Sequence, residues 1–374
     1  MITINLNEYK ESKIYFKLFD KIIYDNNISK EIFLQDHSIN PSTYRRCKKG
    51  ELKIGEKIIS ELCNIFEYKM YSSELIDKIE TLFNNIYSDM YYKIYKNYDY
   101  YINEIEKYLN KKTILFPLFI SFKLFLEISS QKKMKHIRNQ TKDLYDELKK
   151  YSSFFIGELE EIYDIVCLFL EENISENKWI RNYSDGSGYF VLNSRALENS
   201  NHMISLFFGE KAREKLYDDG CILRILALNN NMMLSMLNVG NYRECKNLSI
   251  KQIKILQSLN MEDYKNPIFK FTLHKFLLSS LYLKEYTDVV EYYENKNYYS
   301  YTTISCYLVA LYNCDNNKYA QFLNEALIDQ DIETCDFINY INEIITKKQK
   351  VNLDKLSYFK LNQVMKDFFE NYRN

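Results

Sequence analysis

The sequence predicts an all-α protein, and three features of its 374 residues favour that class. Only 8 glycines and 3 prolines are present, too few for the many tight turns of a β-rich chain. After Phe66, apolar residues recur at spacings of three and four almost throughout, as in helices that pack through one face. From about Leu223 one helical layout returns several times, which predicts stacked helical hairpins. We expect an N-terminal domain at residues 1–68 and a helical array at residues 69–374.

The N-terminal domain is predicted to contain two short helices joined by a turn. Ser29 is a candidate N-cap for the first helix, and we assign its inward face to Ile32 and Phe33. Asn40-Pro41 is a turn signal, because the residue before a proline disfavours helix and proline suits a first helical position. The first helix should therefore end near Ser38.

The second helix of this pair is predicted over about Pro41 to Lys49. Ile39 lies in the turn, where an apolar side chain can fill the space between the two helices. Tyr44 and Cys47, three residues apart, should face inward, and Gly50 should end the helix. A further helix can close this small core with an apolar stripe formed by Ile58, Ile59, Leu62, Cys63 and Phe66.

The outward face of the second helix is expected to be basic. It should carry Ser42, Arg45, Arg46 and Lys49. From Ser42 to Lys57 there are six Lys or Arg residues against two Glu residues, a local net charge of +4 in a chain whose total is −1. Cations gathered on one surface suit a phosphate backbone, as do the free N–H groups at a helix start. We predict DNA binding here; the alternative is a basic helix face that contacts only solvent.

Residues 28–50 resemble, without a gap, the lambda-repressor-like (XRE-type) helix-turn-helix. The matching positions are the start of the first helix, the apolar turn residue, the Ser-Thr that opens the recognition helix, and the Arg and Gly that follow: Ser29, Ile39, Ser42, Thr43, Arg46 and Gly50. The sequence departs from that pattern at Lys30, Ser38 (in place of the turn Gly) and Lys48.

Composition limits the class of protein. Hydrophobic content of 46% and charged content of 27% are ordinary for a soluble globular protein. The eight cysteines are scattered without a CxxC pair, which favours reduced core residues over disulfides or a metal site. The first five residues lack a signal-peptide pattern, and the most apolar run, Ile114–Phe122, is too short to span a bilayer. We expect a cytoplasmic protein with no membrane segment, metal or cofactor.

The middle of the chain is predicted to be helical up to about residue 171. Apolar spacing indicates two or three long helices over Ser73–Tyr108 and Thr113–Ser129, and two more over Thr141–Tyr151 and Phe155–Glu171. Asn173–Ser200 breaks the pattern and contains a Gly-Ser-Gly sequence. No strand precedes it and no Lys-Ser/Thr follows, so we interpret it as a flexible connection and not as a phosphate-binding loop.

The repeats are clearest over residues 217–346. An apolar helix, a turn and a tyrosine near the start of a second helix recur, with these tyrosines, Tyr242, Tyr286 and Tyr319, spaced by 44 and 33 residues. The layout resembles degenerate tetratricopeptide (TPR) repeats, which have a period of about 34 residues; the longer spacing contains an insertion around Asn260–Pro267. The resemblance implies a TPR-like α-superhelix of helical hairpins. Asp331–Thr346 and Asp354–Tyr372 are expected to form its closing hairpin.

Such a stack presents a concave face lined by the first helix of each hairpin. An extended peptide suits a groove of this kind, because amide side chains can both donate to and accept from its main chain. On the repeat register the inward positions are Asn230, Asn238, His274, Tyr282 and Tyr307. They are our candidate peptide contacts, although ordinary solvent-facing or inter-helix residues would show the same pattern.

The combination of these two domains resembles the RRNPP-type, peptide-pheromone-responsive transcription regulators (Rgg-like and PlcR-like). The resemblance implies a cytoplasmic homodimer that binds double-stranded DNA and a short linear signalling peptide, without a cofactor. It places Ser42, Thr43, Arg45 and Arg46 at the major groove, with Lys30, Lys49 and Lys53 near phosphates. A peptide in the groove would shift the equilibrium between two arrangements of the DNA-binding heads.

Two other classes of function were weighed. An enzyme would need a nucleophile with a base, a metal set or a phosphate cradle, and none is evident, so we predict that the chain is not an enzyme. A TPR-like protein–protein interaction scaffold, with its N-terminal helices serving only as a cap, is the second candidate. A scaffold of this kind should show no salt-dependent affinity for DNA.

Overall fold

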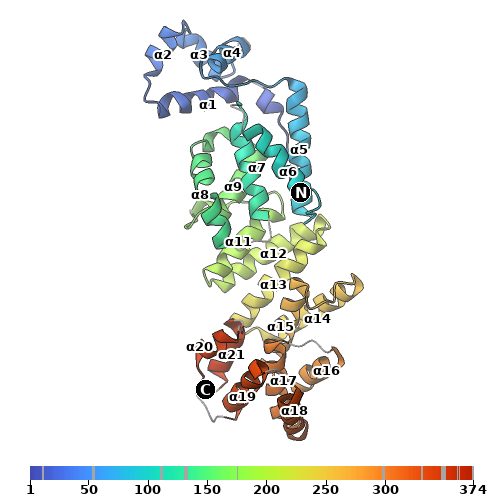
Figure 1. Ribbon diagram of the computed structural model, residues 1–374. Coiled ribbons are helices and arrows are strands. Elements are labelled where there is room, and N and C mark those ends of the chain that lie inside the picture. Colours follow the sequence, from blue (N-terminus) through green and yellow to red (C-terminus); the bar gives the residue numbers. More distant parts are fainter. Residues whose placement is uncertain are drawn as a thin grey trace. The chain divides into compact units, whose positions relative to one another are not determined.

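The computed structural model describes residues 1–10, 12–52, 55–109, 113–129, 134–174, 176–296, 300–329, 332–346, 351–359, 361 and 363–372. Over these ranges the chain is helical and contains no strand, which confirms the all-α class (Figure 1). It divides into two compact units, residues 1–200 with 207–225, and residues 201–206 with 226–374. The predicted N-terminal domain lies within the first unit.

The first unit begins with a 3-10 helix and contains η1 (Asn7–Lys10), α1 (Ser12–Asp25), α2 (Lys30–Asp36), α3 (Pro41–Lys48), α4 (Gly55–Ile65), α5 (Ser73–Tyr91), α6 (Tyr98–Leu109), α7 (Phe116–Ser129), α8 (Met134–Lys149), η2 (Ser152–Phe154), α9 (Glu158–Leu170), α10 (Glu176–Ile180) and α11 (Gly186–Glu198). Two helices carry residues of both units, α12 (His202–Asp218) and α13 (Ile222–Asn238). The second unit continues with α14 (Tyr242–Ser258), α15 (Pro267–Tyr282), α16 (Tyr286–Lys296), α17 (Tyr301–Cys314), α18 (Asn316–Asp329), α19 (Ile332–Ile345), α20 (Leu353–Tyr358) and α21 (Gln363–Asn371).

Helix α7 forms much of the core of the first unit. It packs against α5, α6, α8 and α9, so most of its side chains are buried. Phe83 of α5 stacks on Phe122 of α7 with 3.9 Å between ring centroids, and Phe83 also meets Phe119 edge-on. The most apolar run of the sequence is therefore accounted for by this core. Over the described ranges, no helix combines the length and the apolar character needed to cross a membrane.

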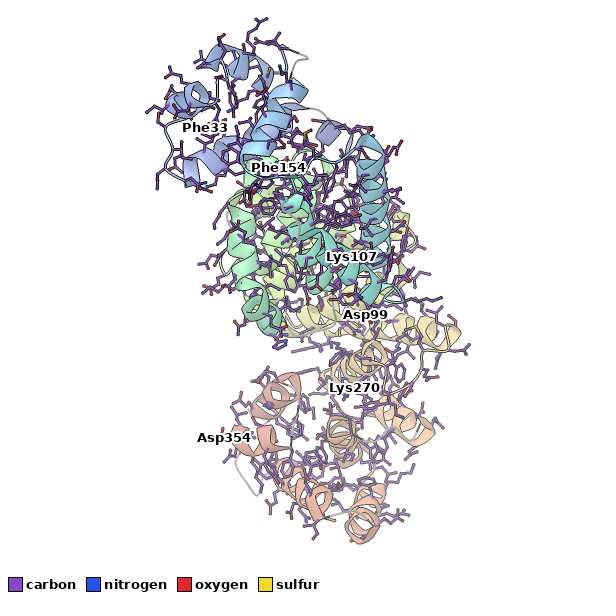
Figure 2. All side chains as sticks on the ribbon, turned by 45° about the horizontal axis from the view of Figure 1, so that its top comes forward. Phe33, Asp99, Lys107, Phe154, Lys270 and Asp354 are labelled. Atoms are coloured by element: carbon purple, nitrogen blue, oxygen red, sulfur yellow. The ribbon has the colours of Figure 1, made fainter. Side chains whose placement is uncertain are left out.

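The N-terminal residues are joined to the middle helices by buried contacts. The hydroxyl of Tyr9, in η1, donates a hydrogen bond of 2.8 Å to the carbonyl oxygen of Phe154, in η2. The two rings also pack edge to face, with centroids 5.3 Å apart; Phe154 is labelled in Figure 2. The hydroxyl of Tyr15, in α1, in turn donates to the carbonyl of Tyr9. These contacts hold α1 against the rest of the first unit.

The expectation of a flexible connection over residues 173–200 is wrong, because Gly186 begins the largely buried helix α11. The carboxylate of Asp185 caps this helix by accepting from the amide of Ser187 at 2.8 Å. A Cβ atom at Gly188 would lie 2.2 Å from the ring of Tyr183, so glycine is required by close packing. The Gly-Ser-Gly sequence thus marks a tight helix contact, and an acidic group already occupies the helix start.

The repeated segments of the second unit form helices at the expected places. Tyr242 opens α14 and Tyr286 opens α16, while Gly240 takes a left-handed φ of 78° in the turn before α14. The insertion around Asn260–Pro267 forms the loop between α14 and α15. Neighbouring helices pack in the pairs α14–α15, α16–α17 and α17–α18, and α15 and α19 both contact α17.

The closing segment differs from the prediction of one helix over Asp354–Tyr372. Two short helices, α20 and α21, stand in its place. Phe359 and Leu361 are both buried between them. The other half of the predicted hairpin is α19; Asp331 lies outside the described residues.

Candidate functional site

A short turn joins α2 to α3. Ser29 precedes α2 at the N-cap position, but its side chain forms no capping hydrogen bond. Ser38 adopts a left-handed φ of 55°, a conformation that usually favours glycine. The amide of Ile39 donates to the carbonyl of Leu34 at 2.7 Å, and the Ile39 side chain is buried as predicted. The turn is therefore closed by backbone bonds and by one apolar residue.

The inward face of α2 is only partly the predicted one. Phe33 is buried and stacks on Phe66, with ring centroids 5.3 Å apart. Ile32, however, is 58% exposed, and Leu34 takes the second inward position with 2% exposure. The helix has fewer than two turns, so its apolar run Ile32-Phe33-Leu34 did not determine which two residues point inward.

Helix α3 is fixed at its start and along one side. The side-chain oxygen of Asn40 accepts from the amides of Ser42 at 2.9 Å and Thr43 at 3.3 Å, and Pro41 occupies the first helical turn. Tyr44 and Cys47 are buried as predicted, and the ring of Tyr44 meets Phe16 of α1 with centroids 4.7 Å apart. Because these residues lie on one side, the opposite side of α3 is turned to solvent.

Asp20 of α1 anchors the edge of α3. Its carboxylate accepts from the hydroxyl of Tyr44 at 2.6 Å and forms ion pairs with Lys30 and Lys48. Burial opposes its ionisation, but the hydrogen bonds from Lys30, Lys48 and Tyr44 outweigh burial and lower the pKa of Asp20. Lys30, a predicted phosphate contact, is therefore engaged by a carboxylate in the chain itself.

The remaining predicted DNA contacts form what we call the basic face of α3: Ser42, Arg45, Arg46 and Lys49, all exposed. Arg45 forms no ion pair with any residue that the structure describes. Arg46 and Lys49 each lie 3.9 Å from the carboxylate of Glu51, and all three side chains are at least half exposed. Such loose surface pairs contribute little and exchange readily. Thr43 is half-buried beside this face, and Lys53 lies outside the described residues.

Two of the predicted peptide contacts lie on α13. Asn230 is buried, donates to the carbonyl of Ile268 at 3.1 Å and accepts from the hydroxyl of Thr272 at 3.3 Å. Asn238 is exposed, and its amide donates to the carbonyl of Leu234 in its own helix. Asn230 therefore ties α13 to α15, which is the inter-helix alternative considered from the sequence.

His274, on α15, is buried next to Tyr264. Its Nε2 atom lies 2.7 Å from the Tyr264 hydroxyl. Burial, with Lys275 and Lys270 nearby, lowers the pKa of His274 to about 3, so this imidazole is neutral at physiological pH.

The two predicted tyrosines stack on neighbouring rings. Tyr282 lies on Tyr242 with centroids 4.3 Å apart, and Tyr307 on Tyr293 at 4.0 Å. The Tyr307 hydroxyl also donates to Glu294 at 3.1 Å. Their assignment as peptide contacts stays a prediction, as it does for the other three, and none of the five lines the groove described next.

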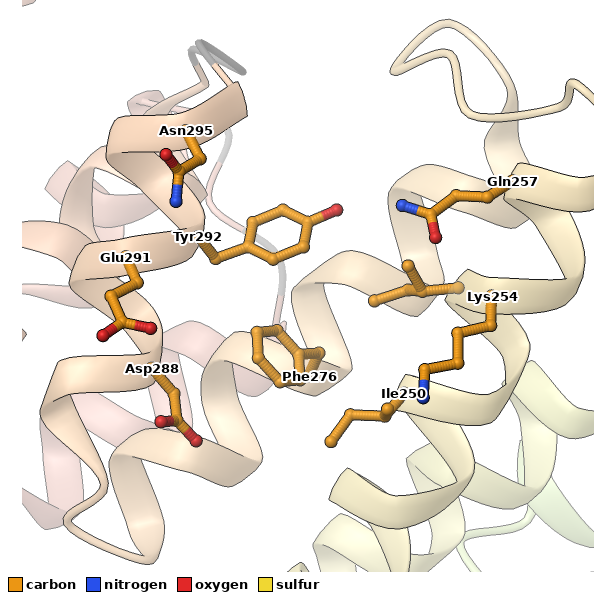
Figure 3. A pocket seen from close by; sticks show the side chains of 9 residues that line it. Ile250, Lys254, Gln257, Phe276, Asp288, Glu291, Tyr292 and Asn295 are labelled. Carbon is orange, nitrogen blue, oxygen red and sulfur yellow. The ribbon is translucent and has the colours of Figure 1, made fainter.

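A groove of about 370 Å³ opens between α14 and α16 of the second unit, with α15 at its floor (Figure 3). Ile250, Ile253, Lys254 and Gln257 line the α14 side, Phe276 lies at the floor, and the α16 side carries Asp288, Glu291, Tyr292 and Asn295. This groove was not predicted from the sequence, because the predicted groove lies on the first helices of the hairpins. No local pattern signalled it, because the groove arises from how α14, α15 and α16 pack.

The two sides of this groove carry opposite charge. Lys254 stands on α14, and Asp288 and Glu291 stand on α16. Asp288 also pairs with the nearly buried Lys246. Neither Lys254 nor Glu291 forms an ion pair over the described ranges.

The cysteines are the other reactive side chains to consider. All eight cysteines are free thiols and six are buried; burial raises the pKa of Cys63 to about 12. Among the described residues, no three His, Cys, Asp or Glu side chains gather to hold a metal ion.

Comparisons with known protein families, curated proteins and solved structures find no match for this chain. The function is therefore argued from its own residues.

Proposed function

We propose that this chain is a DNA-binding transcriptional regulator whose basic face of α3 enters the major groove of double-stranded DNA. The observation that carries the proposal is the orientation of α3. Tyr44 and Cys47 bury one side of the helix, while Arg45 and Arg46 project from the other into solvent. Arginine side chains so placed can bind the O6 and N7 atoms of guanine with two hydrogen bonds each.

Three further features support this reading. The proposed lambda-repressor-like helix-turn-helix is supported by two short helices, α2 and α3, joined by a turn in which Ser38 adopts a left-handed φ. Asp20 holds α3 and forms ion pairs with Lys30 and Lys48, which leaves Arg45, Arg46 and Lys49 for an external anion. Among the described residues, Glu51 alone pairs with this face, at 3.9 Å from Arg46 and from Lys49, and a phosphate can displace so exposed a partner.

The test selects duplexes from a randomised library with the full-length chain and measures affinity for the enriched site at several salt concentrations. We expect an enriched sequence, inverted-repeat symmetry if the chain acts as a homodimer, and affinity that falls steeply with salt. The double variant Arg45→Ala/Arg46→Ala should lose at least about 30-fold in affinity, since each two-bond base contact contributes about 1–3 kcal/mol.

The matched control is Lys149→Ala/Lys150→Ala, which removes the same two charges from an exposed helix end in the same unit. It should retain the wild-type affinity, and both variants should keep the far-UV circular dichroism of helices. If no sequence is enriched and binding is insensitive to salt, the interaction scaffold becomes the better account. Equal loss in both double variants would mean that only total charge matters.

The groove between α14 and α16 favours a second activity, the binding of a short linear peptide. Its apolar floor suits one or two apolar side chains, and its oppositely charged sides suit a peptide with one acidic and one basic residue. We propose this groove as the peptide site of a TPR-like domain, with the stacked helices also available for dimer formation.

A randomised peptide library displayed on phage, panned against the full-length chain, tests the groove. Enriched peptides should carry opposite charges, and Lys254→Glu should reduce their affinity about tenfold. Lys251→Glu, an exposed change on the same helix outside the groove, is the control. Equal effects of the two variants would reject the groove as the peptide site.

A further inference from the structure

We propose that a second cavity, in the first unit, binds a small carboxylate with an apolar body, whose charged end lies between Lys93 and Arg224. The cavity has a volume of about 170 Å³ and is lined by residues of α5, α7, α9, α11 and α13. Water occupies about 30 Å³ per molecule in the liquid, so the space equals roughly six waters. That size suits a short fatty acid or an aromatic acid and excludes a nucleotide.

Arg224 supplies one cation of this cavity. Its guanidinium lies over the rings of Tyr91 and Phe190, at 5.1 and 5.5 Å from their centroids. One terminal nitrogen donates to the hydroxyl of Ser187 at 2.7 Å, but the Nε–H group is buried without an acceptor over the described ranges. A buried donor without a partner is unfavourable, and a carboxylate would satisfy it.

Lys93 supplies the other cation. It follows α5 in a left-handed turn, with φ of 58°, and its ammonium group lies 6.0 Å from the ring centroid of Phe190. Burial and the charge of Arg224 lower its pKa to about 8, so at pH 7 it still carries most of its charge. Two like charges are therefore held at one end of the same cavity.

No carboxylate neutralises this pair within the described part of the chain. Neither Lys93 nor Arg224 forms an ion pair there. The buried carboxylate of Asp185 is already committed, because it accepts from the amides of Ile2 and Ser187 and from the hydroxyl of Tyr87. Both residues are half-buried. Charges largely withdrawn from water are normally paired, so two cations facing one cavity point to an external anion.

The other lining residues indicate which chemical group is attached to the ligand's carboxylate. Phe125 of α7, with Ile165 and Phe169 of α9, forms an apolar wall, and none of the described lining residues is acidic. Arginine binds a carboxylate through two parallel hydrogen bonds, and lysine adds a point charge. The shared chemistry of the ligand is thus a carboxylate on a compact apolar group. A free small acid and the C-terminal residue of a peptide both provide it.

Calorimetric titration of the full-length chain at pH 7, without DNA, tests the proposal. One arm uses octanoate, with 1-octanol and octylamine as matched probes that lack the anion. The other arm uses the tripeptide Ala-Ala-Phe with a free carboxylate and its C-terminal amide. We expect octanoate or the free-acid peptide to bind at least about tenfold more tightly than its uncharged or cationic counterpart, and the arm that binds identifies the source. If neither acid binds, the proposal is overturned.

Variants locate the binding. Lys93→Met and Arg224→Gln should each weaken binding of the acid about tenfold or more, whereas Lys96→Met, an exposed lysine three residues from Lys93, should not. Because Lys93 lacks an ionic partner, Lys93→Met should also keep or raise the melting temperature of the ligand-free protein. Unchanged affinity in both variants, or a Lys93→Met protein that melts earlier, would overturn the assignment. DNA binding does not enter these measurements, so their outcome is independent of the proposed regulator function.

Discussion

The polar residues of α3 and those of α13–α15 have opposite roles in this molecule. On α3, Arg45 and Arg46 project into solvent while the apolar side of the helix is buried. On α13 to α15, the amides Asn230 and Gln252 lie between helices with Thr272. Polar side chains thus form a proposed binding surface in one region and part of the core in the other.

The difference follows from how many partners each helix has. Helix α3 packs on one side only, so its polar residues at other positions stay exposed. Helix α15 packs against α14, α16 and α17, and nearly all its positions from Phe269 to Leu281 are buried. A polar residue there must find a hydrogen bond inside the protein. Polar residues in well-packed repeats are therefore weak indicators of a binding groove.

The largest effect on stability is expected from removing the side-chain amide of Gln252, which joins three helices. Gln252 donates to the carbonyl of Leu226 at 3.0 Å and to the hydroxyl of Thr272 at 2.8 Å, and it is fully buried. Gln252→Ala should lower the free energy of unfolding by about 2–4 kcal/mol, through lost hydrogen bonds and a new cavity. Urea denaturation followed by circular dichroism measures it.

Gln257→Ala is the matched control, since this exposed glutamine lies on the same helix. It should change the unfolding free energy by no more than about 0.5 kcal/mol. Equal losses for the two variants would contradict the view that buried amides hold this region together.

Much of the helical architecture could be predicted from sequence spacing, because long helices repeat their apolar residues many times. The helices around Tyr242 and Tyr286 begin where expected. Short elements were less predictable. In α2 the inward positions are Phe33 and Leu34, and Ile32 is exposed. The prediction of a flexible connection around Gly188 was also wrong. A glycine is needed there because a Cβ atom would collide with the ring of Tyr183.

The candidate sites were predictable only where they depend on local sequence. The basic face of α3 follows from charge and helical spacing within ten residues, and its exposure agrees with that reading. The cavity near Lys93 and Arg224 joins residues 131 positions apart, with lining residues from five of the described helices. No local pattern contains that information, because the cavity arises from how the helices pack. The groove between α14 and α16 was missed for the same reason.

A second prediction uses the burial of His274 to test the core role of α15. Its pKa is about 3 in the folded chain and 6.5 as the ordinary value, so the unfolded chain binds more protons between these limits. Stability should therefore fall as pH drops below 6.5, by at most about 1.4 kcal/mol for each pH unit. The variant His274→Gln removes this contribution.

Urea denaturation of both proteins at pH 7, 6, 5 and 4 isolates the effect, because carboxylates shared by the two cancel in the difference. The wild-type curve should fall more steeply with acid than that of His274→Gln. Parallel curves would mean that His274 is accessible to protons in the folded protein, as expected of a residue lining an open groove.

The smallest stability effect is expected in the α3 region, at Asp20. Its side chain is 21% exposed and holds Lys30, Lys48 and the Tyr44 hydroxyl. Asp20→Asn keeps the size but removes the charge, so we expect a loss of about 1 kcal/mol in unfolding free energy. That loss should disappear as pH falls through the lowered pKa of Asp20, because the folded wild type then protonates the same group.

The same variant separates positioning from charge in DNA binding. Removing Asp20 adds one positive charge near α3, which by itself would strengthen binding to phosphates. Loosening α3 has the opposite consequence for sequence preference, because base contacts depend on the placement of Arg45 and Arg46. We therefore expect Asp20→Asn to bind random duplex more tightly and to discriminate its selected site less. If discrimination is unchanged, the Asp20 ion pairs do not position α3, and the contacts of Tyr44 and Cys47 with the core are sufficient to orient it.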